Sequence, residues 1–328
     1  MLSRNEYGQL KTVIVGDATG AKIPINDISL RCVNYADRPK DSDLPMPGLY
    51  PQQVIDEANE DIDIFIDFLK GEKIKVLRPD QDHDPEYYTY CPRDTVLVHG
   101  NNVVYTPMSL RARADEHRAY DKLFDGYDAV RHHITIERED SLYNFGCVGN
   151  PKMLALNETE PCFDAANILK HNDDLYYLVS NSGNRKGADT LQEIMGQSTR
   201  VHAIEDVYSY MHLDSTIAFL REGLLLVNPS RIKDKSQLPL PLRNWDIINA
   251  PEPVDIGHHP GHCNASPWIN VNLLSINESL VVLEENQQNL RKELARYNID
   301  SAMLPMRHAR TLGGCFHCIT VDVERKNI

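Results

Sequence analysis

The sequence lacks the marks of secreted and membrane-spanning proteins. Its seven cysteines are odd in number and scattered along the chain, which does not fit the disulfide framework of a small secreted domain and indicates a reducing compartment. Apolar runs are too short for a membrane-spanning helix. The stretch from Met1 to Leu10 has no apolar core of the kind that a signal peptide needs. A cytoplasmic protein without a membrane segment is therefore expected.

Basic residues are also scarce. The chain has 34 Lys and Arg against 48 Asp and Glu, which gives a formal net charge of -14. The lysines and arginines are dispersed rather than gathered in tracts, and no glycine-rich phosphate loop is present, so a nucleic-acid partner is not expected. An acidic balance suits a cationic substrate, although many proteins are acidic for solubility alone.

Two motifs resemble metal sites but lack the ligands to complete one. The run from His258 to His262 is interrupted by a Pro-Gly pair and has no nearby carboxylates. Cys315 and Cys318 form a C-x-x-C pair, but no second pair or histidine cluster at zinc spacing accompanies them. The sequence therefore predicts no metal and no cofactor.

Length and patterning favour one α/β domain over residues 1–328, because 328 residues with 41% hydrophobic content can bury a substantial core. Apolar periodicity predicts helices over residues 52–70, 114–124, 188–195 and 288–297. Strands are expected over residues 13–15, 73–77, 95–98, 103–106, 175–179, 201–204, 216–220, 224–227, 271–276, 280–283, 302–306 and 316–323. The polar, proline-rich stretch 26–51 is predicted to be a long loop, either a surface excursion or a cover over a site.

A unit of helix, short strand and hairpin recurs along the chain. It is clearest near residues 52–106, 188–227 and 288–323, and weaker near 114–179 and 232–283. The strand near residue 13 is expected to complete the last copy. This spacing predicts a closed, pseudo-symmetric α/β ring of about five units. An ordinary α+β domain is the alternative that periodicity leaves open.

Three local motifs carry side chains suited to nucleophilic and acid–base chemistry. Cys318 follows Gly313-Gly314, where the missing side chains let the backbone approach a ligand, and it is expected at the start of a strand. A lone cysteine there is otherwise an inert core residue. His212 and Asp214, expected on one strand, point to the same face. Asp164 lies between apolar neighbours, which suits either a buried orienting carboxylate or a helix cap.

Five motifs, read in order, resemble the arginine amidinotransferase family. They are Cys91-Pro92-Arg93-Asp94, Glu160-Pro161-Cys162-Phe163-Asp164-Ala165-Ala166, Met211-His212-Leu213-Asp214, Asn228-Pro229-Ser230-Arg231 and Gly313-Gly314-Cys315-Phe316-His317-Cys318. The likeness extends over nearly the whole chain. It implies the pentein fold, a five-bladed pseudo-symmetric α/β propeller, which agrees with the five units counted above.

The resemblance also implies roles for the matching residues. Cys318 corresponds to the nucleophile and His212 to the general acid and base. Asp164 corresponds to the carboxylate that orients the histidine. Asp94 and Asp214 correspond to the acids that hold the guanidinium of the donor substrate.

Further matches concern the two ends of the substrate pocket. Arg231 corresponds to the residue that binds the donor's α-carboxylate, and Ser266 falls near another donor contact. Met211 and Ser209 are expected to line the acceptor end. Glycine-type members have asparagine where this chain has Ser209, so the acceptor end is predicted to be roomier and to favour an amine longer than glycine. Cys315 replaces a glycine of the family's glycine stretch.

The chemistry so implied is transfer of the amidino group from L-arginine to an acceptor amine, with release of ornithine. Two carboxylates suit a planar guanidinium because they accept its N–H groups in bidentate geometry. A thiolate that attacks the central carbon ends with an amidino group on sulfur. The acceptor amine then reverses the step, which implies ping-pong kinetics. Small molecules are the expected partners, and a homodimer is left open.

Two other functions remain as alternatives. A hydrolase of the same superfamily, resembling arginine deiminase, would let water attack the cysteine intermediate. A non-catalytic binding protein of the same fold is the third alternative, but it has no need for Cys318, His212 and Asp164 together.

Overall fold

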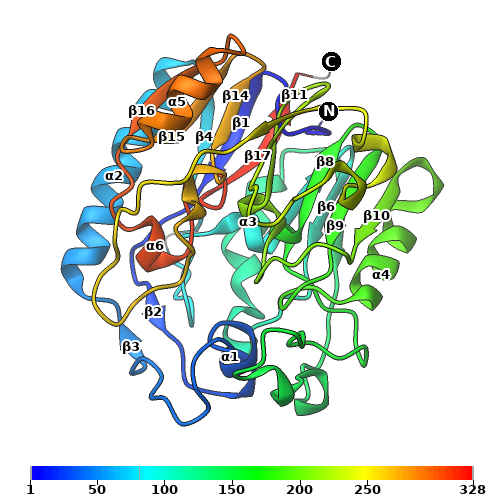
Figure 1. Ribbon diagram of the computed structural model, residues 1–328. Coiled ribbons are helices and arrows are strands. Elements are labelled where there is room, and N and C mark those ends of the chain that lie inside the picture. The colour runs from blue at the N-terminus through cyan, green and yellow to red at the C-terminus, as the bar shows by residue number, and fades with distance from the viewer. Residues whose placement is uncertain (1, 81, 327–328) are drawn as a thin grey trace.

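The computed structural model describes residues 2–80 and 82–326, and these form five sheets of three strands each (Figure 1). In every one of these sheets two strands pair antiparallel and a third lies parallel to one of them. The antiparallel pairs are β17 (Thr320–Arg325) with β1 (Leu10–Val15), β5 (Val96–His99) with β6 (Asn102–Tyr105), β8 (Ile168–His171) with β9 (Asp174–Leu178), β11 (Ile217–Arg221) with β12 (Leu224–Val227), and β14 (Leu274–Asn277) with β15 (Leu280–Glu284). The parallel third strands are β4 (Lys75–Leu77), β7 (Val130–His133), β10 (Arg200–Ile204), β13 (Asp246–Asn249) and β16 (Asp300–Leu304).

The longer helices lie on the outside of this arrangement (Figure 1). They are α2 (Gln52–Gly71), α4 (Arg185–Met195) and α5 (Gln288–Ala295), which confirms the helices predicted near these positions. Their inward faces are apolar, as in α2, where Val54, Phe65 and Leu69 are buried. None of the described helices is both long and apolar enough to cross a membrane.

The two ends of the chain meet in one sheet. β1 pairs antiparallel with β17 in a register that sets Val13 opposite Asp322, and the N and C labels lie close together in Figure 1. The expectation that the first strand completes the last unit is therefore confirmed.

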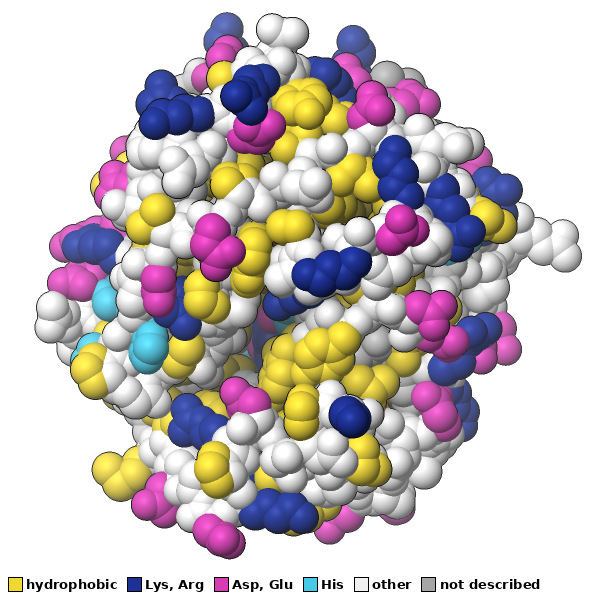
Figure 2. Space-filling view, in the orientation of Figure 1, with side chains coloured by type: hydrophobic (Ala, Val, Ile, Leu, Met, Phe, Trp, Pro, Cys, Tyr) yellow, Lys and Arg dark blue, Asp and Glu magenta, His cyan; other side chains and the backbone are white. Residues whose placement is uncertain are grey.

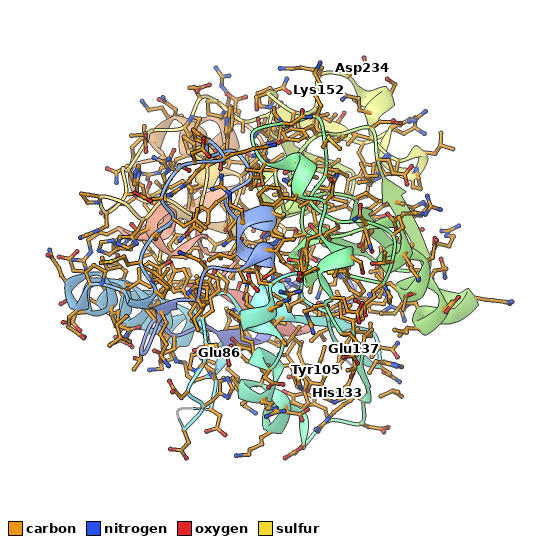
Figure 3. All side chains as sticks on the ribbon, turned by 90° about the horizontal axis from the view of Figure 1, so that it is seen from below. Glu86, Tyr105, His133, Glu137, Lys152 and Asp234 are labelled. Atoms are coloured by element: carbon orange, nitrogen blue, oxygen red, sulfur yellow. The ribbon has the colours of Figure 1, made fainter. Side chains whose placement is uncertain are left out.

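The boundaries of the repeated unit differ from those predicted. Each outer helix leads to a strand that pairs with the hairpin before it, not with the hairpin after it: β10 follows α4 and pairs with β9. A strand that follows a crossover packs back in parallel beside the strand that preceded the crossover. The unit is therefore a hairpin, a crossover and a parallel strand. The rings of Tyr105 on β6 and His133 on β7 stack across one such pair at 4.4 Å (Figure 3).

Two predicted segments have a different local structure. Residues 114–124 are not a continuous helix. They contain the short 3-10 turns Glu116–Ala119 and Asp121–Phe124, and they follow a third, Arg111–Arg113. The buried side chains Arg113, Glu116 and Ala119 recur every three residues, which matches the 3-10 period rather than the α-helical one. The stretch 26–51 is not wholly a loop, because Asp27 caps a short helix, α1 (Ile28–Val33), by accepting from the Leu30 N–H.

Three other predictions were wrong in detail. Cys318 does not begin a strand but lies in a turn before β17, and the predicted strand 271–276 begins only at Leu274. His212 and Asp214 do not lie on a strand: His212 directly precedes a 3-10 turn, Leu213–Ser215, and Asp214 lies within it. The strands β7, β8 and β13 were not predicted, because each is four residues long and carries charged or polar residues in a short apolar frame.

Charged side chains are buried where the units meet. Asp322 on β17 accepts from Ser3 at 3.0 Å, Lys170 of β8 at 2.9 Å and Arg325 at 3.1 Å, and it also pairs with Arg93. A buried charge is tolerated only when it is paired and hydrogen-bonded. This cluster therefore ties the first and last strands to two neighbouring units.

Candidate active site

A cavity opens on one face of the molecule. It encloses about 820 Å³ of space including its mouth, and Figure 2 shows this face hollowed near its centre with hydrophobic side chains beside the hollow. The predicted site residues that line it are Asp94, Asp164, Met211, His212, Asp214, Arg231, Ser266 and Cys318. The fold thus brings together residues that are up to 224 positions apart in the chain, counted from Asp94 to Cys318.

Cys318 is held in a tight turn between α6 (Ala309–Leu312) and β17. Asn272 fixes this turn, because its side-chain oxygen accepts from the Cys315 N–H at 2.9 Å and the Cys318 N–H at 3.2 Å. Its amide nitrogen also donates to the Cys318 sulfur at 3.1 Å. Gly314 has no room for a side chain, since an added Cβ would lie 2.2 Å from the Cys318 Cβ. The turn therefore aims the sulfur at the cavity.

The Cys318 thiol is paired with an ionised carboxylate. Its S–H donates to Asp214 Oδ2 at 3.3 Å, and His317 Nδ1 lies 2.9 Å from the same oxygen. Burial alone would raise the pKa of Asp214, but the hydrogen bond and charge of His317 outweigh burial and lower this pKa to about 2. Contact with the Cys91 thiol, burial and the charge of Asp214 raise the pKa of Cys318 well above its ordinary value. Cys318 is therefore a thiol at rest.

His212 lies between two carboxylates. Its Nε2 is 3.1 Å from Asp164 Oδ2, and its Nδ1 is 3.6 Å from Asp94 Oδ1. Asp164 is held in turn by the N–H and hydroxyl of Ser109, at 3.0 and 3.1 Å. Burial alone would lower the pKa of His212, but Asp94 and Asp164 raise it well above its ordinary value. His212 is thus a cation.

Asp94 has one committed oxygen and one available oxygen. Its Oδ2 accepts from Arg113 at 2.7 Å, and Arg113 is also bound to Glu116 at 2.6 Å. Its Oδ1 is buried and has no hydrogen-bond partner in the part of the chain that the structure describes. Burial raises the pKa of Asp94, although His212 and Arg113 oppose the rise. A buried acceptor without a donor is costly, and a ligand N–H would satisfy it.

Arg231 is a guanidinium without a carboxylate partner among residues 2–80 and 82–326. Its Nη1 donates to the hydroxyls of Ser209, Ser215 and Thr216 at 3.0, 2.8 and 2.8 Å. Burial lowers its pKa. A buried, unpaired guanidinium is suited to bind an anionic group of a ligand.

Ser209 does not line the cavity, contrary to the prediction. Its side chain is 2% exposed, and its hydroxyl donates to the His212 carbonyl at 3.0 Å while accepting from Arg231. A short side chain at this position reaches the backbone of the turn rather than the open space. Ser209 therefore acts on the pocket only through Arg231 and His212. Ser266 does line the cavity, and its hydroxyl accepts from the Trp268 N–H at 3.3 Å.

The stretch 26–51 forms part of the cavity wall. Asn34 lines the cavity, and the Ala36 N–H donates to the Tyr210 hydroxyl at 2.9 Å. Tyr50 accepts from Asn264, another lining residue, at 2.8 Å. Of the two roles left open for this stretch, the structure therefore favours the cover over a site.

Several residues of the site were missed by sequence reasoning. Asn272, Arg113 and Ser109 hold Cys318, Asp94 and Asp164 in place. No local motif points to them because their partners lie 19 to 55 positions away. His317 and Cys91 lie inside quoted motifs without having been given a role. Among the described residues no group of three or more His, Cys, Asp or Glu is arranged to hold a metal.

Comparisons with known proteins agree with this arrangement. No protein-family model matches the sequence. The chain is 39% identical over 336 residues to inosamine-phosphate amidinotransferase 1 of Streptomyces glaucescens, covering 98% of this chain and 95% of that protein. It is 32% identical to the L-arginine:L-lysine amidinotransferase of Pseudomonas savastanoi pv. phaseolicola, covering 99% and 94%. The solved inosamine-phosphate amidinotransferase from Streptomyces griseus superposes with a TM-score of 0.94 at 36% identity, covering 100% of this chain and 97% of that one.

Identity at this level over nearly the full length of both chains, together with the matching fold, shows descent from one family. The chain is a member of the amidinotransferase family, a transferase with the pentein fold.

Proposed function

We propose that this transferase moves the amidino group of L-arginine to an acceptor amine through a covalent intermediate on Cys318, and releases ornithine. The observation that carries the proposal is the convergence in one cavity of a thiol, an imidazolium, two carboxylates beside them and Arg231, which has no carboxylate partner among the described residues. The carboxylates Asp94 and Asp214 bind the donor's guanidinium, and Arg231 binds its α-carboxylate.

Donor binding activates the nucleophile. The guanidinium brings a positive charge beside Cys318, which lowers the pKa of the thiol, and one proton leaves the thiol for solvent. The thiolate then forms a bond to the central guanidinium carbon. The bond from that carbon to the donor's side-chain nitrogen breaks, and the His212 imidazolium gives its proton to the departing nitrogen. The products are a cationic amidino group on sulfur, neutral His212 and ornithine.

The second half-reaction reverses the first. A neutral acceptor amine attacks the amidino carbon, His212 takes a proton from the amine, and the carbon–sulfur bond breaks to restore the thiolate. Asp164 keeps Nε2 of His212 oriented through both halves. Water in place of the amine would release urea from the sulfur. The deiminase-like hydrolase alternative differs already in the first half-reaction: ammonia would leave while the ornithine nitrogen stays bonded to the carbon, and water would then release citrulline.

The nucleophile is tested by replacing it. Cys318→Ala should abolish ornithine formation from arginine and acceptor amine, because no other thiol in the cavity is held against both Asp214 and Asn272. Cys315→Ala is the matched control. Cys315 is a buried neighbour that takes part in no step of the mechanism, so this variant should retain most activity. The measurement is ornithine and citrulline formation by the purified variants with and without an amine. Citrulline without any amine requirement would show a hydrolase, and equal losses in both variants would mean that the nucleophile is wrongly assigned.

We further propose that the acceptor is larger than glycine. The proteins compared above carry inosamine phosphate and L-lysine in their names, and the cavity, at about 820 Å³ including its mouth, has space for an amine of that size. Each methylene that a smaller acceptor lacks weakens its transition-state binding by only about 1–3 kcal/mol. Glycine should therefore react slowly rather than not at all.

Competition between acceptors tests this proposal. Lysine, an amino-cyclitol and glycine are offered together with arginine, and kcat/KM is measured for each product. The larger amines should exceed glycine by at least about tenfold. If glycine exceeds every larger amine, the protein is a glycine amidinotransferase.

A further inference from the structure

A second buried histidine lies behind the nucleophile. His317 directly precedes Cys318, but its side chain does not line the cavity. Its Nδ1 is 2.9 Å from Asp214 Oδ2 and its Nε2 is 3.4 Å from Glu6 Oε2. Glu6 comes from the segment before β1, so the contact joins the first residues of the chain to the catalytic turn.

The geometry determines the charge of this imidazole. A neutral imidazole has one N–H and one lone pair, so one ring nitrogen would present a lone pair to a carboxylate oxygen. With a carboxylate at each nitrogen, the favourable state has both nitrogens protonated. Burial and the charge of Arg93 would lower the pKa of His317, but Asp214 and Glu6 raise it. His317 is therefore an imidazolium in the resting protein.

Other charged groups around His317 leave this pairing intact. Arg93 donates to the His317 carbonyl at 3.3 Å and lies 3.6 Å from Glu6. Lys170 donates its backbone N–H to Glu6 at 3.2 Å and extends its ammonium to Asp322. Glu6 thus has the side chains of Arg93 and His317 and the Lys170 N–H as neighbours. Asp214, in contrast, has only His317 and the Cys318 thiol as hydrogen-bond donors among the described residues.

We propose that His317 is a positioning residue for amidino transfer, holding Asp214 ionised and oriented so that one carboxylate oxygen meets the Cys318 sulfur and the other is left to the donor's guanidinium. This role rests on the proposed function. The positive charge of His317 also offsets the negative charge of Asp214 next to the sulfur. Without that charge, the thiolate would be disfavoured.

The test replaces the charge while keeping a donor. In His317→Asn the side-chain amide can still donate to Asp214, but it carries no charge. The pH profile of kcat/KM for arginine should move toward higher pH by about 1 unit, with a smaller change in the arginine KM. His99→Asn is the control, because His99 is also buried but burial lowers its pKa to about 3, so it is neutral at working pH and should keep the wild-type profile.

Two measurements keep the proposal testable if His317→Asn folds poorly. NMR of wild-type protein labelled at histidine nitrogen should show His317 doubly protonated at pH 7, and Glu6→Gln should lower the pH at which it loses a proton. A neutral His317 at pH 7, or an unshifted profile in folded His317→Asn, overturns the proposal. In His317→Asn the pH dependence of Cys318 alkylation by iodoacetamide should also shift toward higher pH, and this measurement needs no arginine. A further outcome is that the wild type shows the NMR result and His317→Asn the alkylation shift, while the wild type releases no ornithine. That outcome would refute the proposed function and not the role of His317 in setting the pKa of the Cys318 thiol.

Discussion

At the scale of single residues, the protonation state of Cys318 is set by its immediate neighbours. Contact with Cys91, burial and the charge of Asp214 raise the pKa of Cys318, while the hydrogen bond from His212 opposes the rise. Attack requires the thiol to lose its proton. In the proposed reaction kcat/KM for arginine should therefore increase as the pH rises above neutrality. It should level off above the pKa of the thiol in the free protein.

Replacing Cys91 tests this account. Cys91→Ala removes the first of the causes that raise the thiol's pKa, so the pH profile of kcat/KM should shift toward lower pH, opposite to the shift expected for His317→Asn. Profiles measured from pH 6 to pH 10 would reveal the direction. A profile unchanged by Cys91→Ala would mean that burial and Asp214 alone control the thiol.

At the scale of elements, hydrogen bonds at Asn34, Ala36 and Tyr50 join the stretch 26–51 to the residues around the cavity. The Tyr210 hydroxyl accepts from the Ala36 N–H at 2.9 Å, and Gly149 donates to the Ala36 carbonyl at 2.6 Å. Both contacts lie just beyond α1. The bond to Tyr210 is thus one of several that hold this part of the cavity wall.

Tyr210→Phe should loosen that attachment. The lost hydrogen bond is worth about 0.5–1.5 kcal/mol, so the KM for the acceptor should rise several-fold and amide exchange over residues 28–36 should accelerate. Tyr208→Phe is the control, because Tyr208 is 50% exposed and forms no side-chain hydrogen bond with the described protein. Equal amide exchange in the two variants would show that Tyr210 does not hold the stretch.

At the scale of the whole molecule, the buried charges around Asp322 connect several units. Asp322→Asn leaves Lys170, Arg93 and Arg325 with an uncompensated buried charge. Breaking a buried ion pair in this way costs about 3–5 kcal/mol. Unfolding in urea should therefore begin at a clearly lower concentration. Arg296→Gln, which breaks a pair with Glu293 in which the arginine side chain is 74% exposed, should change stability by less than about 1 kcal/mol. Similar unfolding curves for the two variants would contradict a stabilising role for the cluster.

The sequence alone was sufficient where information is local. Apolar periodicity determined the helices α2, α4 and α5, because an amphipathic helix records its buried face in its own residues. The ordered motifs identified the family and seven predicted site residues that line one cavity, and Ser266 was the eighth predicted residue there. Each of these motifs is short and contiguous in the sequence, and its resemblance to the family implied the roles of its residues.

Only the tertiary structure decided what depends on distant partners. A helix was predicted at 114–124, but the pairing of Arg113 with Asp94 and of Glu116 with Thr95 stabilises 3-10 turns there. Ser209 was expected in the pocket, yet Arg231, which is 22 positions away, takes its hydroxyl. His317 stood in a quoted motif, but its charge follows from Glu6, 311 positions away. Hydrogen bonds and burial depend on separation in space, and the folded ring brings together groups that no sequence window contains.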